Sequence, residues 1–324
     1  DEYLAALGEE TGEDQEEKDN KAYQKQLFLD YVLRKEDHLE VRKELKRRFD
    51  AGAELTGPKG LRKQLAAFDL GYFGRAYLKH YFVRPSPAFH EELDEIWTNG
   101  VLKKRNPYTD AAEISRLDGS RNVAAAPRGH AKSTNFTFKD TLHAALYLYK
   151  HYVIILSDSS DQAEGFLTDI KTELEDNREI RLDFGAQQGR VWKSNVILTA
   201  GNVKIEAIGS GKKVRGRRHG AWRPDLLVLD DVENDENVNT PEQRRKLDSW
   251  FKKAVSKAGD TYTDIMYIGT VLHYDSLLSN VLKNPEYESK TYRAVISFAV
   301  RDDLWDEWTE IYTNLFDKDH KQHA

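Results

Sequence analysis

The sequence lacks several residue types and patterns, and each absence excludes a class of protein. Its 324 residues include no cysteine, which excludes disulfides and thiolate metal sites and is usual for a protein of a reducing cytosol. No apolar run approaches the ~18 residues of a transmembrane helix, and no signal peptide is recognisable. We therefore expect a soluble, globular protein without a membrane partner. The only methionine is Met266 and the first residue is Asp1, so we expect a processed or truncated piece of a longer chain.

Charge is abundant and unevenly distributed. Charged residues make up 32% of the chain, and the formal net charge is −6. Residues 1–20 contain nine acids and one lysine, a balance of −8, so the rest of the chain carries about +2. A body of low net charge can still bind nucleic acid through a local basic patch. We interpret residues 1–20 as an acidic, flexible arm, in which Tyr3–Leu7 is the candidate for a short helix.

The rest of the chain divides by the periodicity of its apolar residues. Residues 21–110 follow helical patterns, and we expect a helical N-terminal lead-in. In residues 111–300 short apolar runs alternate with helical patterns, which predicts an α/β core with a mainly parallel sheet flanked by helices. Residues 301–324 predict a helical tail or a linker towards a further domain.

Short apolar runs in the α/β region predict its strands. The predicted strands are Val123–Ala126, Tyr152–Leu156, Leu226–Leu229, Ile265–Ile268 and Tyr292–Val300. The run LLVL at Leu226–Leu229 is apolar throughout, as expected of a strand that is buried on both faces. Val196–Leu198 and Val203–Ile205 flank a turn-like TAGN sequence and predict a hairpin.

A candidate phosphate loop follows the first predicted strand. Its residues are Pro127, Arg128, Gly129, His130, Ala131, Lys132, Ser133 and Thr134. A strand, a small-residue turn and a helix start form a geometry that binds phosphates, in which main-chain N–H groups face the anion, a lysine reaches the outer phosphates and a hydroxyl holds magnesium. The standard pattern G-x-x-x-x-G-K-[ST] is not matched, because Ala126 and Ala131 replace its two glycines. An ordinary surface turn is the alternative interpretation.

A second candidate element is acidic. The run Leu226–Leu229 ends in Asp230 and Asp231, which suits a Walker B site. There Asp230 would bind Mg²⁺, directly or through water, beside the hydroxyl of Ser133. The next carboxylate would orient or deprotonate the attacking water. That residue is normally a glutamate and is Asp231 here, and Glu233 is close enough to be a rival. Strands capped by acids are also common without such a role.

The densest basic cluster lies between the two candidate elements, in the stretch KKVRGRRH. Its candidate residues are Lys212, Lys213, Arg215, Arg217 and Arg218. An exposed loop that grips DNA phosphates is one interpretation. An arginine that neutralises charge on the γ-phosphate of a neighbouring subunit is another, and a solvated loop is the third. Because Asp230 follows soon after, we expect the cluster to enter near the active-site edge of the sheet.

Two weaker signals complete the set. Gly269 and Thr270 end the predicted strand Ile265–Ile268, and in translocating ATPases such a strand end senses the γ-phosphate and transmits hydrolysis to DNA-gripping parts. Phe89 and His90 lie upstream of the loop, where some nucleotide-hydrolysing proteins place a group against the adenine. A packed or solvent-facing histidine is the alternative at this position.

Four stretches occur in an order that resembles the ATPase domain of the large terminase subunit, the DNA-packaging motor of tailed bacteriophages. They are PRGHAKST, IILSDSSDQAEGFL, VRGRRHGAWRPDLLVLDDVEN and YIGTVLHYDSLL, and the resemblance covers residues 85–300. That family departs from the standard phosphate loop in the way seen here, with an arginine after the strand, a missing glycine and then Lys-Ser/Thr. The resemblance implies a P-loop NTPase fold of the ASCE or RecA-like kind that uses ATP and Mg²⁺.

The resemblance also implies roles for single residues. The implied positions are Lys132 for phosphate binding, Ser133 and Asp230 for magnesium, Asp231 for catalysis, and Gly269 and Thr270 for coupling. Arg128 and Arg215 match places where the family puts arginines that act on the nucleotide, in cis or from a neighbour. Arg217 and Arg218 remain alternatives for that role.

A terminase assignment implies partners and a location. The chain would translocate double-stranded DNA as a homo-oligomeric ring on the phage portal, with the small terminase subunit as a partner, in the host cell cytoplasm. Large terminases also carry a nuclease domain, for which the 24 residues after Val300 are too few, so we expect no DNA cleavage by this chain. The alternatives are another P-loop DNA-dependent ATPase or helicase-like protein, and a nucleic-acid-binding adaptor with a degenerate nucleotide site.

Overall fold

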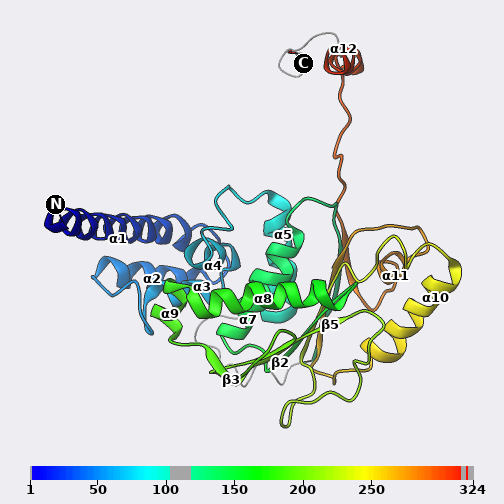
Figure 1. Ribbon diagram of the computed structural model, residues 1–324, viewed down its shortest axis with the longest axis horizontal. Coiled ribbons are helices and arrows are strands. Elements are labelled where there is room, and N and C mark those ends of the chain that lie inside the picture. Colours follow the sequence, from blue (N-terminus) through cyan, green and yellow to red (C-terminus); the bar gives the residue numbers. More distant parts are fainter. Residues whose placement is uncertain (1, 103–117, 315–318, 320–324) are drawn as a thin grey trace. The chain divides into compact units, whose positions relative to one another are not determined.

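The structure is a computed structural model that describes residues 2–102, 118–314 and 319 (Figure 1). Asp1–Tyr292 form one compact unit, and Arg293–Ala324 form a second. The expected boundary between helical lead-in and α/β core, at residue 110, lies outside the described residues. Among the described helices, none has both the length and the apolar character needed to cross a membrane.

A mainly parallel sheet forms the centre of the first unit. Its strands are β1 Arg121–Ala125, β2 Tyr152–Ser157, β3 Gln188–Trp192, β4 Val196–Thr199, β5 Lys204–Gly209, β6 Leu226–Asp230, β7 Asp264–Gly269 and β8 Glu288–Thr291. They lie in the order β3-β4-β5-β2-β6-β7-β1-β8. The run from β5 to β8 is parallel, whereas β3, β4 and β5 pair antiparallel at one end. The predicted mainly parallel sheet and the predicted hairpin are therefore confirmed.

Helices cover both faces of this sheet (Figure 1). The helices on the first face are α1 Glu2–Val32, α2 Leu39–Asp50, α3 Leu61–Ala66, α4 Leu70–Tyr77, α5 Ala88–Trp97, the π-helices η1 Thr98–Leu102 and η2 Ser133–Lys139, α7 Asp140–Leu146, α8 Ser160–Asp176 and α9 Arg178–Phe184. Those on the second face are α10 Pro241–Trp250, the π-helix η3 Phe251–Val255 and α11 Leu277–Val281. Strand β6 shows the division, because Leu226 and Val228 pack into the first layer and Leu227 and Leu229 into the second.

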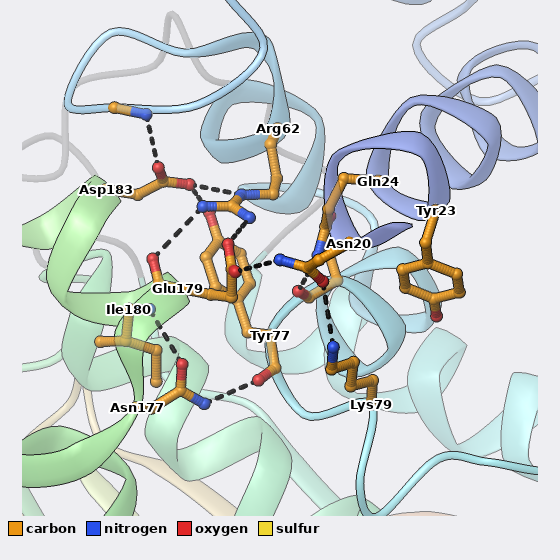
Figure 2. A network of polar contacts seen from close by, with 12 residues as sticks. Asn20, Tyr23, Gln24, Arg62, Tyr77, Lys79, Asn177, Glu179, Ile180 and Asp183 are labelled. Carbon is orange, nitrogen blue, oxygen red and sulfur yellow. Dashed lines mark hydrogen bonds and ion pairs between the residues drawn. The ribbon is translucent and has the colours of Figure 1, made fainter. Parts of the chain in front are cut away.

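A buried ionic network joins the N-terminal helices to the α/β core (Figure 2). Arg62 on α3 donates from Nε to Oδ2 of Asp183 on α9 at 2.7 Å and also pairs with Glu179. The hydroxyl of Tyr77 on α4 donates to the same Asp183 oxygen at 2.6 Å, and the N–H of Gly57 donates to the other oxygen at 2.6 Å. The two side chains of the Arg62–Asp183 pair are completely buried. The N-terminal helices are thus fixed to the core by charges that must stay paired.

The first helix differs from the expectation for the N-terminus. Residues 2–20, expected as a flexible arm with at most the short helix Tyr3–Leu7, belong to the continuous helix α1. The segment is rich in strong helix formers such as Ala, Leu, Glu and Gln. The i,i+4 pair of Glu17 and Lys21, at 2.7 Å, adds support where the helix approaches the core.

The last strand of the sheet was predicted in the wrong place. Tyr292–Val300 is not a strand; β8 is the polar, exposed segment Glu288–Thr291 that precedes it. Edge strand β8 pairs with β1 through main-chain bonds, and the N–H of Tyr292 closes the pairing on the carbonyl of Ala125 at 2.8 Å. The apolar residues further on belong to the second unit and are exposed, Ile296 at 93%.

The second unit contains one described helix, α12 Asp302–Thr313, in the range predicted as a helical tail. Its aromatic side chains contact one another, with ring centroids of Trp305 and Trp308 at 5.7 Å and of Trp308 and Tyr312 at 4.7 Å.

The first unit also contains α9 and β3, for which the sequence made no prediction. Strand β3 has no clear alternation of buried and exposed residues, which is why its pattern gave no signal.

Candidate nucleotide-binding site

The candidate phosphate loop connects the end of β1 to the start of η2. Gly129 and Ala131 both have left-handed backbone conformations, with φ of 78° and 52°. Glycine adopts this conformation freely, whereas an L-residue pays roughly 1–2 kcal/mol for it. Ala131 occupies the position of the second glycine of the standard pattern. The loop therefore has a left-handed residue at this position, although that residue is alanine and not glycine.

The predicted lysine and hydroxyl meet the two predicted acids. Lys132 Nζ lies 2.8 Å from Oδ2 of Asp231, and the lysine is buried. The hydroxyl of Ser133 donates to Oδ1 of Asp230 at 3.0 Å. The loop follows β1, Asp230 ends β6 and Asp231 follows it, and the carboxyl ends of these parallel strands lie on the same side of the sheet. The structure thus brings together four residues that are nearly a hundred positions apart in the sequence.

Asp230 sits in a fully buried environment that favours its neutral form. Burial raises the pKa of its carboxyl group to about 6, and the neighbouring Asp231 adds to the rise. Hydrogen bonds from Thr137 and Ser133, together with the charge of Lys132, oppose it. The Thr137 hydroxyl donates to Oδ2 at 2.5 Å. A carboxylate whose charge is poorly compensated is a favourable ligand for a divalent cation.

Thr137 was missed by the sequence reasoning. It lies four residues after Ser133 on the helix that follows the loop, so both hydroxyls project from one side of that helix towards Asp230. The i,i+4 spacing of two hydroxyl residues was the available signal.

The sequence reasoning also did not single out Asp158. It follows β2 next to β6, and its Oδ2 accepts from the Asn234 side chain at 3.2 Å.

Asp231 connects the acidic strand end to the end of β7. Its own φ is 40°, an uncommon left-handed conformation for a residue other than glycine. Its Oδ1 accepts from the main-chain N–H of Thr270 at 2.8 Å. A Cβ atom at Gly269 would lie 3.1 Å from Cδ2 of Leu278 and 3.4 Å from the same Asp231 oxygen. Of the two residues predicted for coupling, Thr270 thus bonds to the carboxylate predicted for catalysis, and Gly269 precedes it.

Glu233, the alternative candidate for the catalytic base, follows β6 in the sequence, and its side chain contacts the first residues of α11. Its Oε1 accepts from the N–H of Leu277 at 2.6 Å, and its Oε2 accepts from the N–H of Leu278 at 2.8 Å. Burial raises the pKa of this carboxyl group, and the two main-chain bonds oppose the rise. Both carboxylate oxygens therefore serve as acceptors for otherwise unpaired helix N–H groups.

The other loop residues lie nearer to solvent. The Arg128 side chain is 65% exposed, with Nη2 at 3.7 Å from Oδ2 of Asp235. Pro127 and Thr134 are half-buried. The loop main chain is held from outside, because the carbonyl of His130 accepts from Nε2 of His90 at 2.8 Å. The histidine considered for adenine contact is therefore found against the loop backbone.

The basic cluster runs along β5 from the side of the sheet that carries the carboxyl ends of the parallel strands to the side that carries their amino ends. It starts at the carboxyl end of β5, where the N–H of Lys212 donates to the carbonyl of Gly209 at 3.4 Å. It ends at the amino edge, where Nε2 of His219 bonds to the carbonyl of Asn202 at 2.9 Å. Only the first part of the cluster thus enters at the edge that carries Asp230.

Within the cluster the basic side chains differ in their surroundings. Arg217 pairs with Glu206 in the middle of β5, away from the phosphate loop. The four others, Lys212, Lys213, Arg215 and Arg218, are exposed. Trp250 at the end of α10 donates from its indole N–H to the carbonyl of Lys212 at 2.8 Å, which anchors the first part of the cluster.

The side chains at the loop fit a magnesium ion that is bound together with a nucleotide. Mg²⁺ prefers oxygen ligands and usually keeps several water and phosphate ligands, so one carboxylate and one hydroxyl from the protein suffice. Asp230 and Ser133 provide these two groups side by side. In the described parts of the chain, no three His, Cys, Asp or Glu residues gather into a metal-binding group.

Comparisons with solved structures show remote similarity to phage large terminases and to a DEAD box protein. The HK97 bacteriophage large terminase is 13% identical with a TM-score of 0.41, over 74% of this chain and 46% of that one. The large terminase ATPase domain of Thermus phage P74-26 is 17% identical with a TM-score of 0.35, over 74% and 96%. A DEAD box protein from Methanococcus jannaschii is 13% identical with a TM-score of 0.34, over 62% and 54%.

No family model and no curated protein sequence matches the chain. The chain spans less than half of the HK97 protein. In its own sheet, β7 separates the loop strand β1 from the acidic strand β6, which is the strand arrangement of the ASCE class of P-loop NTPases. The chain therefore has an α/β fold with the strand order of a P-loop NTPase.

Proposed function

We propose that this chain is the ATP-hydrolysing motor domain of a viral terminase large subunit, which translocates double-stranded DNA into a procapsid. The observation that carries the proposal is the meeting of Lys132 and Ser133 with Asp231 and Asp230 at one edge of the sheet. A lysine and a hydroxyl from the phosphate loop, facing two acids from a buried strand, form the set of groups that nucleoside triphosphate hydrolysis requires.

The chemistry would proceed by exchange of partners within this set. Lys132 leaves Asp231 and binds the outer phosphates, because a phosphate offers more negative charge than one carboxylate. Asp231, released from the lysine but still held by the N–H of Thr270, accepts a proton from the attacking water. Asp230 and Ser133 would hold Mg²⁺, which would supply positive charge to the phosphates.

Asp231 is the better candidate for the base than Glu233. Both oxygens of Glu233 are engaged by the N–H groups of α11, whereas the Asp231 side chain is 27% exposed and faces the loop lysine. A general base must be within reach of the water that it activates. The aspartate also takes the position directly after Asp230, where the catalytic carboxylate usually stands.

Coupling and arginine roles follow from the same geometry. The hydrogen bonds of Asp231 with Thr270 and with Ile268 offer a route by which the state of the nucleotide reaches β7 and the segment after it. Arg128 in the loop and Arg215 in the basic cluster are both exposed, so each is available to act on a nucleotide, in cis or in a neighbouring subunit. Arg217 is the weakest candidate, since Glu206 holds it.

The partners of the proposal are double-stranded DNA, further copies of the chain in a ring on the phage portal, and the small terminase subunit, in the host cell cytoplasm. The exposed residues Lys212, Lys213 and Arg218 are candidates for DNA phosphate contacts. Such contacts bind without sequence preference and weaken as salt concentration rises.

The proposal is tested by the rate of Mg-ATP hydrolysis with and without double-stranded DNA, at two salt concentrations. A terminase motor predicts hydrolysis that DNA stimulates, and less stimulation for the Lys212→Ala/Lys213→Ala variant. Lys252→Ala removes an exposed lysine from the neighbouring η3 and is the matched control. Hydrolysis without any DNA effect would indicate another P-loop ATPase, and absence of both hydrolysis and nucleotide binding would indicate a degenerate site.

A further inference from the structure

The left-handed Ala131 raises the question of what holds the phosphate loop in shape. At φ of 52° an alanine is less stable than in its ordinary conformations, so the loop would relax unless other contacts oppose it. Glycine, which the standard pattern has here, would need no such support. The residues around Ala131 should therefore include a group that favours this conformation.

His90 makes the contact that depends most directly on the conformation of Ala131. Its Nε2 lies 2.8 Å from the carbonyl oxygen of His130. That carbonyl belongs to the same planar peptide group as the N–H of Ala131. A change in φ of Ala131 to negative values rotates this peptide group and turns the carbonyl away from His90. The hydrogen bond and the left-handed conformation are thus two aspects of one geometry.

His90 is itself held firmly. It lies in the first turn of α5 and is only 9% exposed. A second connection ties the same helix to η2, the helix that follows the loop. Asn135 donates from its side chain to Oδ1 of Asp94 at 3.1 Å, and Lys139 Nζ lies 2.6 Å from the same oxygen. Because α5 and η2 are joined in this way, the imidazole cannot easily follow a relaxing loop.

We propose that His90 is a positioning residue that holds the phosphate loop in its nucleotide-binding conformation and replaces the conformational role of the missing glycine at Ala131. The inference rests on the proposed function, since it assumes that this loop binds a nucleotide. A hydrogen bond of this kind and the cost of a left-handed alanine have similar magnitudes, so the bond suffices to decide the balance. The carbonyl is an acceptor only, so Nε2 must carry a hydrogen.

The protonation of His90 agrees with a neutral donor. Burial lowers the pKa of its imidazole, the positive charge of Lys139 lowers it further, and the His130 carbonyl and Asp94 oppose the shift. A neutral imidazole with its hydrogen on Nε2 can make this bond at physiological pH. The geometry of the loop and α5 carries the inference, and the neutral state is compatible with it.

The first test is the dissociation constant of Mg-ADP for four proteins: native, His90→Ala, Ala131→Gly and the double variant. We expect His90→Ala to weaken binding about tenfold in the native background, which corresponds to one lost hydrogen bond. In the Ala131→Gly background we expect a loss below about threefold, because glycine needs no support. His90→Gln, whose amide can also donate, should recover part of the affinity. An equal loss in both backgrounds would overturn the inference.

Binding of Mg-pyrophosphate separates positioning from a direct contact with the base. If His90 acts through the loop, His90→Ala weakens pyrophosphate binding by the same factor as ADP binding. If His90 contacts the adenine, only ADP binding weakens, and the inference is wrong.

Asn202→Gly is the matched control for Ala131→Gly, since Asn202 also has a positive φ, of 62°, in a turn away from the loop. It should leave both affinities unchanged.

Amide hydrogen exchange in nucleotide-free protein keeps this inference separable from the proposed function. The N–H of Asn135 donates to the carbonyl of Ala131 at 3.1 Å, so its protection reports on the loop conformation. We expect faster exchange at Asn135 in His90→Ala and recovery in the double variant with Ala131→Gly. Unchanged exchange would overturn the positioning role. If the variants show this pattern of exchange but the native protein binds no Mg-ADP, the proposed function fails while the positioning role stands.

Discussion

Lys132 Nζ lies 2.8 Å from Oδ2 of Asp231, so the lysine proposed to bind phosphate and the proposed catalytic base form an ion pair. Each has one further proposed role that requires its release, the lysine towards phosphate and the aspartate towards water. The pair joins the loop after β1 to the strand end of β6, across the intervening strand β7. A nucleotide that takes the lysine would therefore also free the base.

The two candidate bases should separate by their effects on turnover and stability. We expect Asp231→Asn to lower the kcat of Mg-ATP hydrolysis by about 10²- to 10⁴-fold, the usual contribution of a general base. Mg-ADP binding should be retained, because Lys132 no longer has a competing carboxylate. Steady-state hydrolysis and calorimetric titration measure the two quantities.

Glu233→Gln is the matched variant. We expect it to lower the free energy of unfolding by about 1–2 kcal/mol, since one of the two acceptors at the start of α11 becomes an amide donor. Its kcat should change less than about tenfold. The opposite pattern, with turnover lost in Glu233→Gln and kept in Asp231→Asn, would transfer the base role to Glu233.

The stability of the nucleotide-free protein should depend on the charge of Asp230. The folded pKa is about 6 and the ordinary value is 3.8, so the native state binds more protons than the unfolded state between these values. The carboxyl group therefore costs nothing well below pH 4, and its cost grows as pH rises and is complete above about 6. We expect Asp230→Asn to stabilise the protein by about 1 kcal/mol more at pH 8 than at pH 5.

Urea unfolding of both proteins at the two pH values measures this difference. Ser133 and Thr137 donate to the two oxygens of Asp230, and asparagine removes one of these acceptors at both pH values, so the difference between the two pH values isolates the charge. A stability difference that is the same at pH 5 and pH 8 would show that the pKa of Asp230 is not raised.

The buried network of Figure 2 predicts a large effect on stability far from the nucleotide site. Arg62→Ala leaves Asp183 buried without its cationic partner and should lower the free energy of unfolding by about 3–5 kcal/mol. Arg47→Ala is the control, because the pair of Arg47 with Glu44 is exposed to solvent and should contribute little to stability. Equal losses in the two variants, measured by urea unfolding, would contradict the structural role of the network.

The parts of the fold that the sequence predicts are those with a local apolar pattern. The strand that ends in Asp230 was predicted because its residues are apolar throughout and are buried on both faces. Strand β8 was missed because main-chain pairing with β1 places it, while its side chains are exposed. The apolar segment after it was predicted as a strand by composition alone, which does not show whether a neighbouring strand exists.

At the site, residue types were predictable and contacts were not. Lys132, Ser133 and Asp230 could be placed together because the order of strands brings their ends to one edge. The engagement of Glu233 depends on α11, which lies more than forty positions further along the chain. The support of the loop by His90 similarly requires the packing of α5 against η2, which no local pattern shows.

The most direct test of the central claim is calorimetric titration of the chain with Mg-ADP, because binding does not require an assembled ring. The native chain should bind, and Lys132→Ala should lose about 10- to 100-fold in affinity with the loss of a charge-assisted contact to phosphate. Lys252→Ala, which removes an exposed lysine paired with Asp248, should bind like the native chain. Binding that is equally strong in Lys132→Ala, or no binding by the native chain, would contradict the assignment of this loop as the nucleotide site.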